Sequence, residues 1–326
     1  MRFREEIFNI KSDQDFTDIA LDLFHYQFEQ NVIYRDFVNT LSINPFTIKR
    51  FENIPFLPIS FFKTQKILTG CQEHAMVFLS SGTSGMERSR HLITDVSVYK
   101  QSLIMGFEYF YGNPSGYKIF GLVPDPVLNP DSSLAFMVNL LMESAHPGEK
   151  YFFIDDFSSL NEKINFYGKR QKQIILIGLT SALMDFSEQF PSGLPDLIVM
   201  ETGGMKGKRK ELIREELHAL LCEQFGVAEI HSEYGMTELL TQAYSKGNGL
   251  FSPPPWMKVL IRDTNDPLTL LKPGKTGGIN VIDLANFNSC PFIATQDLGK
   301  LHKNQQFEVL GRFDQSDIRG CNLMSI

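Results

Sequence analysis

The chain contains 326 residues, which suffices for one large domain or two modest ones with a substantial buried core. Apolar residues make up 43% and charged residues 21%, a composition that is typical of soluble globular proteins and excludes a disordered chain. The net charge of −7 argues against a protein that binds nucleic acids through their phosphates.

The cysteines and the apolar runs exclude further classes of protein. Cys71, Cys222, Cys290 and Cys321 lie far apart and form no CxxC pair, so we expect neither a disulfide framework nor a zinc ribbon. The first ten residues lack the apolar core of a signal peptide, and no apolar run approaches the roughly 18 residues that span a bilayer. We therefore expect a cytoplasmic protein with no membrane span.

The first seventy residues have a helical pattern. Ser12 and Asp15 have the spacing of a capping box, which predicts the start of a helix. Apolar residues then recur at helical spacing, at Phe16, Ile19, Leu23, Phe24 and Phe28. Pro55 and Pro58 interrupt the region, because prolines so close together do not fit a helix interior. We expect residues 1–75 to form a helical extension packed on a core.

Short apolar runs alternate with longer amphipathic segments after residue 75. The runs expected to form buried strands are 76–79, 117–123, 174–179, 197–200 and 227–230. Amphipathic spacing predicts helices at 131–144 and 208–225. This alternation predicts an α/β fold with a largely parallel sheet. From Trp256 onward, strand and turn signals predict a smaller β subdomain.

Six small residues directly follow the expected strand 76–79. They are Ser80, Ser81, Gly82, Thr83, Ser84 and Gly85. Glycines let the backbone approach a polyanion closely, while hydroxyls and amides supply donors without bulk. Arg88 and Arg90 would add charge-assisted hydrogen bonds to phosphate oxygens. The alternative is a solvated turn, because serine and glycine are common in loops.

A second glycine cluster, at Gly203 and Gly204, follows the expected strand 197–200. A flat aromatic ring can lie against these two residues, because no side chain intervenes. The spacing from Gly203 to Gly207 and Lys208 is one residue too short for a P-loop. The alternative is a tight turn between a strand and a helix.

A third candidate segment runs from Tyr234 through Gly235, Met236 and Thr237 to Glu238. The tyrosine offers a stacking face, the glycine permits close approach, and the threonine offers a hydroxyl. The carboxylate of Glu238 is able to hold Mg²⁺. The alternative is a buried tyrosine followed by a threonine that caps a helix.

Two charged residues near the end of the sequence are further candidates for a nucleotide site. Asp297 lies in the segment Thr-Gln-Asp-Leu-Gly, and Arg312 follows Gly311. An aspartate and an arginine are able to share the hydroxyl groups of a ribose.

The hydroxyl–glycine loop, the glycine pair, the segment from Tyr234 to Glu238 and the two charged residues near the end follow one another along the chain. This series of motifs resembles that of the adenylate-forming superfamily of acyl-CoA synthetases, peptide synthetase adenylation domains and luciferases. The resemblance covers residues 76–320 and implies that residues 76–310 form an adenylate-forming core of layered mixed sheets and helices with a small β subdomain. It also implies a site for ATP and Mg²⁺. The implied phosphate residues are Ser80 to Gly85, with Arg88 or Arg90 in place of a loop lysine, and Thr237. The implied adenine residues are Gly203, Gly204 and Tyr234, with Gly235 and Met236 beside them. Glu238 would bind Mg²⁺. Asp297 and Arg312 would bind the ribose.

Within this superfamily, the sequence is similar to the acyl-protein synthetases of the bacterial bioluminescence fatty-acid reductase complex. Those proteins also have a helical N-terminal extension, a Gly-Met-Thr-Glu segment and a cysteine close to the C-terminus. The resemblance implies that Cys321, on a short hinge and tail at residues 311–326, accepts the acyl group; the alternative is an ordinary tail cysteine. Because the sequence stops at Ile326, we expect the superfamily's C-terminal lid domain and its catalytic lysine to be absent.

The resemblance implies that the protein activates a carboxylic acid as an acyl-adenylate with release of pyrophosphate, and that this acid is a fatty acid. A thiol would then accept the acyl group, which splits one difficult acylation into two easier steps. The strand exit at Gly178 to Thr180 is a candidate border of the carboxylate pocket. Three alternatives stay open: a CoA ligase, an enzyme that passes the adenylate to a carrier protein, and a non-catalytic nucleotide-binding module. The implied protein partners are an acyl reductase or an acyltransferase.

Overall fold

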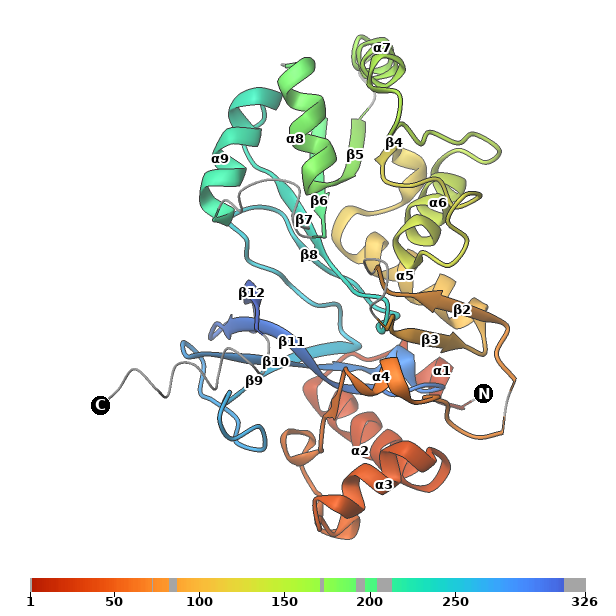
Figure 1. Cartoon of the computed structure of the whole chain (residues 1–326), viewed down its shortest axis with the longest axis vertical. Coiled ribbons are helices and arrows are strands. Elements are labelled where there is room, and N and C mark those ends of the chain that lie inside the picture. The colour runs from red at the N-terminus through yellow and green to blue at the C-terminus, as the bar shows by residue number, and fades with distance from the viewer. Residues whose placement is uncertain are drawn as a thin grey trace. The chain divides into compact units, whose positions relative to one another are not determined.

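The computed structural model describes residues 2–71, 73–81, 87–170, 173–191, 197–203 and 213–313. The chain forms two compact units (Figure 1). Unit 1 combines the chain up to Ser102 with residues 237–241 and the chain from Ser252 onward, and unit 2 combines residues 103–236 with 242–251. Within the described ranges, no helix has both the length and the apolar character that a membrane crossing requires.

Helices form the N-terminal part of unit 1, as the sequence predicted. They are α1 (Arg2–Ile7), α2 (Asp13–Gln30), α3 (Val32–Thr40) and α4 (Phe61–Thr64), with the 3₁₀ turns η1 (Pro45–Thr47) and η2 (Phe51–Asn53). The predicted capping box is confirmed: the Asp15 N–H donates to Ser12 Oγ over 3.1 Å, and the Ser12 N–H donates to the Asp15 carboxylate over 3.0 Å. The buried face of α2 contains Phe16, Ile19, Leu23 and Phe24.

A mixed sheet follows in the C-terminal part of unit 1. Its strands are β1 (Leu57–Pro58), β9 (Met257–Arg262), β10 (Thr276–Asp283), β11 (Phe292–Leu301) and β12 (Phe307–Arg312). The order is β1–β11–β10–β9, with β12 also paired to β11; β1 is parallel to β11 and the other pairs are antiparallel. A separate hairpin pairs β2 (Met76–Leu79) with β3 (Arg90–Ile93). The expected strand-rich C-terminal region is therefore present.

Buried polar side chains join the N-terminal helices to the turn η4 (Leu284–Asn286) and the residues after it. Gln27 Nε2 donates to the Phe287 carbonyl over 2.7 Å, and Asn31 Nδ2 donates to the Ser289 carbonyl over 2.9 Å. The Thr69 hydroxyl donates to the same Ser289 carbonyl over 2.7 Å. Because buried carbonyls need donors, these side chains satisfy a segment that belongs to no strand.

Unit 2 contains the parallel sheet that the alternation of strands and helices predicted. Its strands are β4 (Tyr117–Leu122), β5 (Gln173–Leu179), β6 (Leu197–Thr202), β7 (His231–Tyr234) and β8 (Ala243–Ser245). They lie in this order, and β4 to β7 are parallel while β8 is antiparallel to β7.

The strand expected at 227–230 begins only at His231. Gly226 ends the preceding helix in the left-handed conformation, with a φ of 66°, and the Val227 N–H donates to the Cys222 carbonyl over 3.2 Å. The apolar residues after Gly226 therefore complete the end of a helix before the chain enters the sheet. The prediction was wrong here because a helix-ending turn and a buried strand have the same apolar composition.

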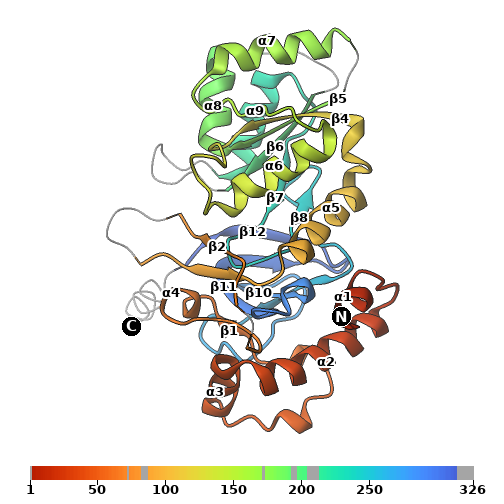
Figure 2. The ribbon, with the colours of Figure 1, turned by 90° about the vertical axis from the view of Figure 1, so that its right-hand side faces the viewer.

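Helices cover both faces of the parallel sheet (Figure 2). They are α5 (Val96–Tyr111), whose residues from Leu103 belong to unit 2, α6 (Ser133–Ala145), α7 (Phe157–Gly168), α8 (Thr180–Gln189) and α9 (Arg214–Phe225), with the 3₁₀ turn η3 (Pro114–Gly116) before β4. One apolar cluster joins α7, α8 and α9 to the strand residues Phe120, Leu122, Ile174 and Leu176. On the other face, a Cβ at Gly121 would lie 3.2 Å from Val138 and 3.0 Å from Met142 of α6. The missing side chain of Gly121 thus lets α6 pack closely on β4.

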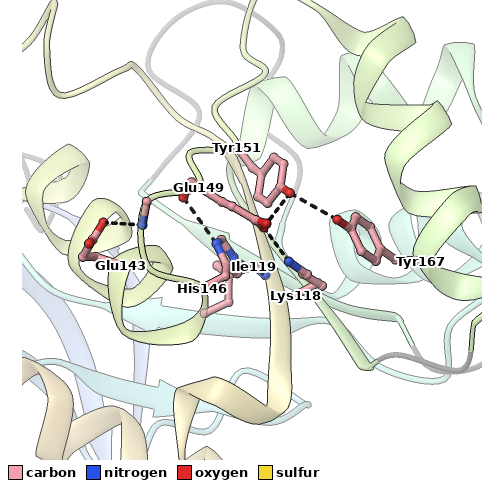
Figure 3. A network of polar contacts seen from close by, with 8 residues as sticks. Lys118, Ile119, Glu143, His146, Glu149, Tyr151 and Tyr167 are labelled. Atoms are coloured by element: carbon pink, nitrogen blue, oxygen red, sulfur yellow. Dashed lines mark hydrogen bonds and ion pairs between the residues drawn. The ribbon is translucent and has the colours of Figure 1, made fainter.

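A polar network at the start of β4 centres on Lys118 (Figure 3). Its ammonium lies 2.6 Å from the Glu149 carboxylate, 4.8 Å from the centroid of the Tyr167 ring and 5.4 Å from that of Tyr151. The Tyr151 hydroxyl donates to Glu149 over 2.7 Å and lies 3.2 Å from the Tyr167 hydroxyl. The network ties β4 to α7 and to the segment between α6 and α7.

We expect Lys118→Met to lower the free energy of unfolding by about 1–2 kcal/mol. The change removes an ion pair and cation–π contacts from an ammonium whose side chain is only 18% exposed. Urea-induced unfolding, followed by circular dichroism, measures the difference.

Lys163→Met is the matched control, because Lys163 is an exposed residue of α7 whose ammonium lies 5.7 Å from the Tyr151 ring. Its loss is expected to cost less than about 0.5 kcal/mol. Equal effects of the two substitutions would contradict the stabilising role of the Lys118 network.

Candidate functional site

The parallel strands of unit 2 end at one edge of the sheet, where ligands bind in open α/β folds. Thr180 begins α8 directly after β5, and its hydroxyl lies 2.7 Å from the Gly203 carbonyl and 2.9 Å from the Glu201 carboxylate. Gly203 follows β6 with a φ of +70°, a conformation that favours glycine. The structure thus brings together two strand exits that the sequence had identified, at Thr180 and Gly203; Gly204 lies outside the described residues.

Tyr234 and Gly235 leave β7 at the same edge. The Tyr234 ring is only 7% exposed and packs against the Phe251 ring, with centroids 5.9 Å apart. A Cβ at Gly235 would overlap the Glu233 carboxylate, so a side chain at this position would displace that buried acid. The ring of Tyr234 is therefore buried, as the alternative interpretation expected, and its role beside adenine stays a prediction.

Two buried acids beside these residues were not identified from the sequence. Burial raises the pKa of Glu233 to about 7, although the Thr202 hydroxyl donates to its carboxylate over 2.5 Å; the neighbouring charge of Glu201 raises it further. Burial also acts to raise the pKa of Glu201, but His218, whose Nε2 lies 3.5 Å from the carboxylate, and the charge of Arg214 outweigh it and the pKa is lowered. The signal that could have revealed Glu201 is a carboxylate directly after an apolar strand run; Glu233 lies in the polar strand His-Ser-Glu-Tyr, which gives no such signal.

In unit 1, the carboxylate of Glu238 lies at the centre of the candidate residues. Glu238 is 5% exposed, and burial raises the pKa of its carboxyl while a hydrogen bond from the Ser89 hydroxyl opposes the rise. Ser89 in turn pairs with Ser80: the Ser80 N–H donates to the Ser89 carbonyl over 3.0 Å, and the Ser89 N–H donates to Ser80 Oγ over 2.9 Å. The hydroxyl–glycine loop therefore begins beside Glu238.

The two arginines of this loop differ in environment. Arg88 Nε donates to the Ser80 carbonyl over 2.5 Å, and its Nη2 lies 3.4 Å from the Leu79 carbonyl, so its guanidinium binds the backbone at the start of the loop. Arg90 is exposed at the start of β3. Ser81 is exposed as well, and Gly82 to Gly85 lie outside the described residues.

Asp297 and Arg312, the predicted ribose residues, face each other across β11 and β12. Arg312 Nε lies 3.5 Å from Asp297 Oδ1, and both charges act on Glu238: that of Arg312 lowers the pKa of the Glu238 carboxyl, and that of Asp297 raises it. Four residues chosen from distant segments, Ser80, Glu238, Asp297 and Arg312, thus form one cluster in unit 1.

The donor atoms of this cluster suit a magnesium ion that is bound together with phosphates. Mg²⁺ prefers carboxylate oxygens and is commonly held by one or two carboxylates plus substrate phosphates. The buried carboxylate of Glu238 has a raised pKa, as expected for a group that a cation would stabilise. Among the described residues, no three His, Cys, Asp or Glu side chains are arranged to hold a metal ion by themselves.

The described cysteines differ in their access to solvent. Cys71 is exposed, Cys222 is partly buried and Cys290 is buried. Burial raises the pKa of the Cys290 thiol to about 12, which leaves almost no thiolate at neutral pH. Cys321, the predicted acyl acceptor, lies outside the described residues.

Solved structures of adenylate-forming enzymes share this fold. A 2-hydroxyisobutyryl-CoA ligase structure matches with a TM-score of 0.67 at 12% identity, over 96% of this chain and 75% of that one. ATP-bound MatB from Rhodopseudomonas palustris matches with a TM-score of 0.56 at 14% identity, over 74% of this chain. This match spans about half of the MatB chain, 49%. The predicted fold class is thereby confirmed.

Sequence comparison identifies the family. The chain is 26% identical over 327 residues to the long-chain-fatty-acid–luciferin-component ligase of Vibrio harveyi. This match covers 92% of this chain and 84% of that protein. The family model described as "Acyl-protein synthetase, LuxE" matches residues 11–325. The chain therefore belongs to the LuxE family of acyl-protein synthetases, which are acyl-adenylate-forming ligases.

Proposed function

We propose that this enzyme uses MgATP to convert a long-chain fatty acid into an acyl-adenylate and then transfers the acyl group to Cys321. The observation that carries the proposal is the cluster of Ser80, Glu238, Asp297 and Arg312 in a chain of the acyl-protein synthetase family. The Vibrio harveyi relative is named as a ligase of a long-chain fatty acid, which supports the choice of substrate.

The first half-reaction forms a mixed anhydride. A carboxylate oxygen of the fatty acid attacks the α-phosphorus of ATP, the bond to the bridging oxygen breaks, and pyrophosphate leaves. Ser80 and the loop after it would donate hydrogen bonds to the phosphates, and Asp297 with Arg312 would bind the ribose hydroxyls. Glu238 would hold Mg²⁺, which when bound offsets the negative charge of the phosphates.

The adenine would lie beside Gly203, Gly204 and Tyr234, with Gly235 and Met236 next to the tyrosine. Gly203 supports this role because its left-handed backbone favours glycine, and a side chain at Gly235 would displace the Glu233 carboxylate. Arg88 or Arg90 would serve in place of a loop lysine, and the exposure of Arg90 leaves its guanidinium accessible to a ligand.

In the second half-reaction, a thiolate attacks the acyl carbonyl carbon and AMP leaves. Cys321 is the proposed nucleophile, and among the described cysteines Cys290 is unsuitable because its thiol is buried and has a raised pKa. A thioester on Cys321 would pass its acyl group to a partner protein, an acyl reductase or an acyltransferase. Coenzyme A and a carrier protein are the alternative acceptors, since structural neighbours include a CoA ligase.

We expect Glu238→Gln to reduce fatty-acid-dependent release of pyrophosphate by about 100-fold or more, because the amide holds Mg²⁺ poorly. The assay couples pyrophosphate release to a colorimetric readout at saturating ATP. Glu52→Gln, which makes the same chemical change in a surface pair with Arg50, is expected to retain the wild-type rate. A Glu238→Gln enzyme of normal rate would contradict the role of this carboxylate.

We expect Cys321→Ser to release pyrophosphate in a first turnover but to retain no acyl group. Intact-mass spectrometry after incubation with MgATP and a long-chain fatty acid measures the acyl adduct, and hydroxylamine is expected to remove it from the wild type, as it cleaves thioesters.

Cys71→Ser is the matched control, because Cys71 is an exposed cysteine, and this variant is expected to acquire the full adduct. Loss of the adduct in Cys71→Ser alone would instead make Cys71 the acceptor. Pyrophosphate release without any adduct on the wild-type protein would move the acceptor to another molecule.

A further inference from the structure

We propose that His91 is a positioning residue for adenylation: with Asn286, it fixes the backbone that presents Glu238. This inference rests on the proposed role of Glu238 in binding MgATP. It concerns residues of unit 1 that the sequence patterns did not identify, and neither side chain belongs to the proposed ligand contacts.

The backbone around Glu238 lacks the hydrogen bonds of regular secondary structure. β7 ends at Tyr234, and residues 235–242 form turns and irregular chain before β8 begins at Ala243. Buried backbone groups in such a segment need side-chain partners, because an unsatisfied group costs about 1–3 kcal/mol. The position of the Glu238 carboxylate therefore depends on the side chains that bind this backbone.

His91 binds the carbonyl that precedes Glu238. It lies on β3, fully buried, with its ring edge against the Phe62 ring at a centroid distance of 5.8 Å. Its Nδ1 lies 2.7 Å from the Thr237 carbonyl oxygen. A carbonyl offers no hydrogen, so the hydrogen of this bond is on Nδ1.

Asn286 binds the next carbonyl, and its amide oxygen faces the other nitrogen of the ring. Its Nδ2 donates to the Glu238 carbonyl over 2.8 Å and to the Cys290 carbonyl over 3.1 Å. Since both of these partners are acceptors, the amide nitrogen must face them, and Oδ1 faces His91 Nε2 at 3.0 Å. His91 and Asn286 therefore hold two consecutive carbonyls, those of Thr237 and Glu238.

The two contacts of His91 are not equivalent. Burial lowers the pKa of His91 to about 4, although the contacts with Thr237 and Asn286 act in the opposite direction, so the ring has one hydrogen at neutral pH. With that hydrogen on Nδ1, the 3.0 Å contact between Nε2 and the Asn286 amide oxygen joins two acceptors and is not a hydrogen bond. The shorter contact, to the Thr237 carbonyl, is the one that needs it. A substitution that keeps a donor at Nδ1 should thus preserve the position of Glu238, and one that keeps a donor only at Nε2 should not.

Three substitutions of His91 separate these roles. His91→Asn keeps an amide donor near the place of Nδ1, His91→Gln keeps one near the place of Nε2, and His91→Phe keeps a ring without donors. Small displacements of a catalytic group cost large factors in rate. We expect His91→Phe and His91→Gln to reduce kcat for fatty-acid-dependent pyrophosphate–ATP exchange by about 10- to 100-fold and to raise the Mg²⁺ concentration for half-maximal rate.

His91→Asn is expected to stay within about threefold of the wild-type kcat, which is the rescue that a positioning role requires. The KM for the fatty acid is expected to stay unchanged in all three variants. His146→Phe is the control for the loss of a buried histidine, because His146 lies in unit 2 and contacts the backbone of β4; it should exchange pyrophosphate at the wild-type rate.

The outcomes distinguish this inference from the proposed function. An active wild type with equal rates in His91→Asn and His91→Gln would overturn the positioning role and leave the function intact. A wild type without exchange would overturn the proposed function and the inference with it. If His91→Phe fails to fold, as thermal unfolding would reveal, the comparison of His91→Asn with His91→Gln still decides the question.

Discussion

Segment 237–241 imposes the main physical constraint on unit 1, because four of its five residues, 238–241, are buried while the segment contributes to no strand or helix. Its N–H groups at Leu240 and Thr241 donate to the Asp283 carboxylate over 2.7 and 3.1 Å. Its carbonyls at 237 and 238 accept from His91 and Asn286. Burial raises the pKa of Asp283 to about 6, but four hydrogen bonds from this segment and its surroundings oppose the rise. Side chains thus bind both the N–H groups and the carbonyls of this segment. These hydrogen bonds determine the position of Glu238.

The corresponding constraint in unit 2 comes from the parallel sheet. Adjacent parallel strands bring their carboxyl ends to one edge, so polar residues that follow β5, β6 and β7 must lie together. This explains why Thr180 contacts Gly203, 23 residues away, and why Thr202 contacts Glu233 on the next strand. The motifs were visible in the sequence because each directly follows an apolar run, and the sheet geometry then determines which of them meet.

The sequence therefore predicted what depends on local pattern and failed where distant residues meet. The capping box at Ser12, the strand at 76–79 and the largely parallel sheet follow from local pattern. By contrast, His91 reaches Thr237 across 146 positions and Asn286 across 195, and nothing in the neighbouring residues indicates either contact. A lone histidine in an apolar strand and a lone asparagine in a turn have no periodicity, so only the fold identifies their partners.

Carboxylates with raised pKa values stand on both sides of the segment from Tyr234 to Thr237: Glu233 precedes it and Glu238 follows it. A buried carboxylate is costly, and an apolar residue of similar volume is often at least as stable in its place. Stability therefore does not account for either acid. The Glu233 carboxylate also lies where a Cβ at residue 235 would be, so a side chain there would displace this acid. Glu233 in unit 2 and Glu238 in unit 1 are thus each a costly group of the kind that is typical of functional sites, where position and charge matter more than stability.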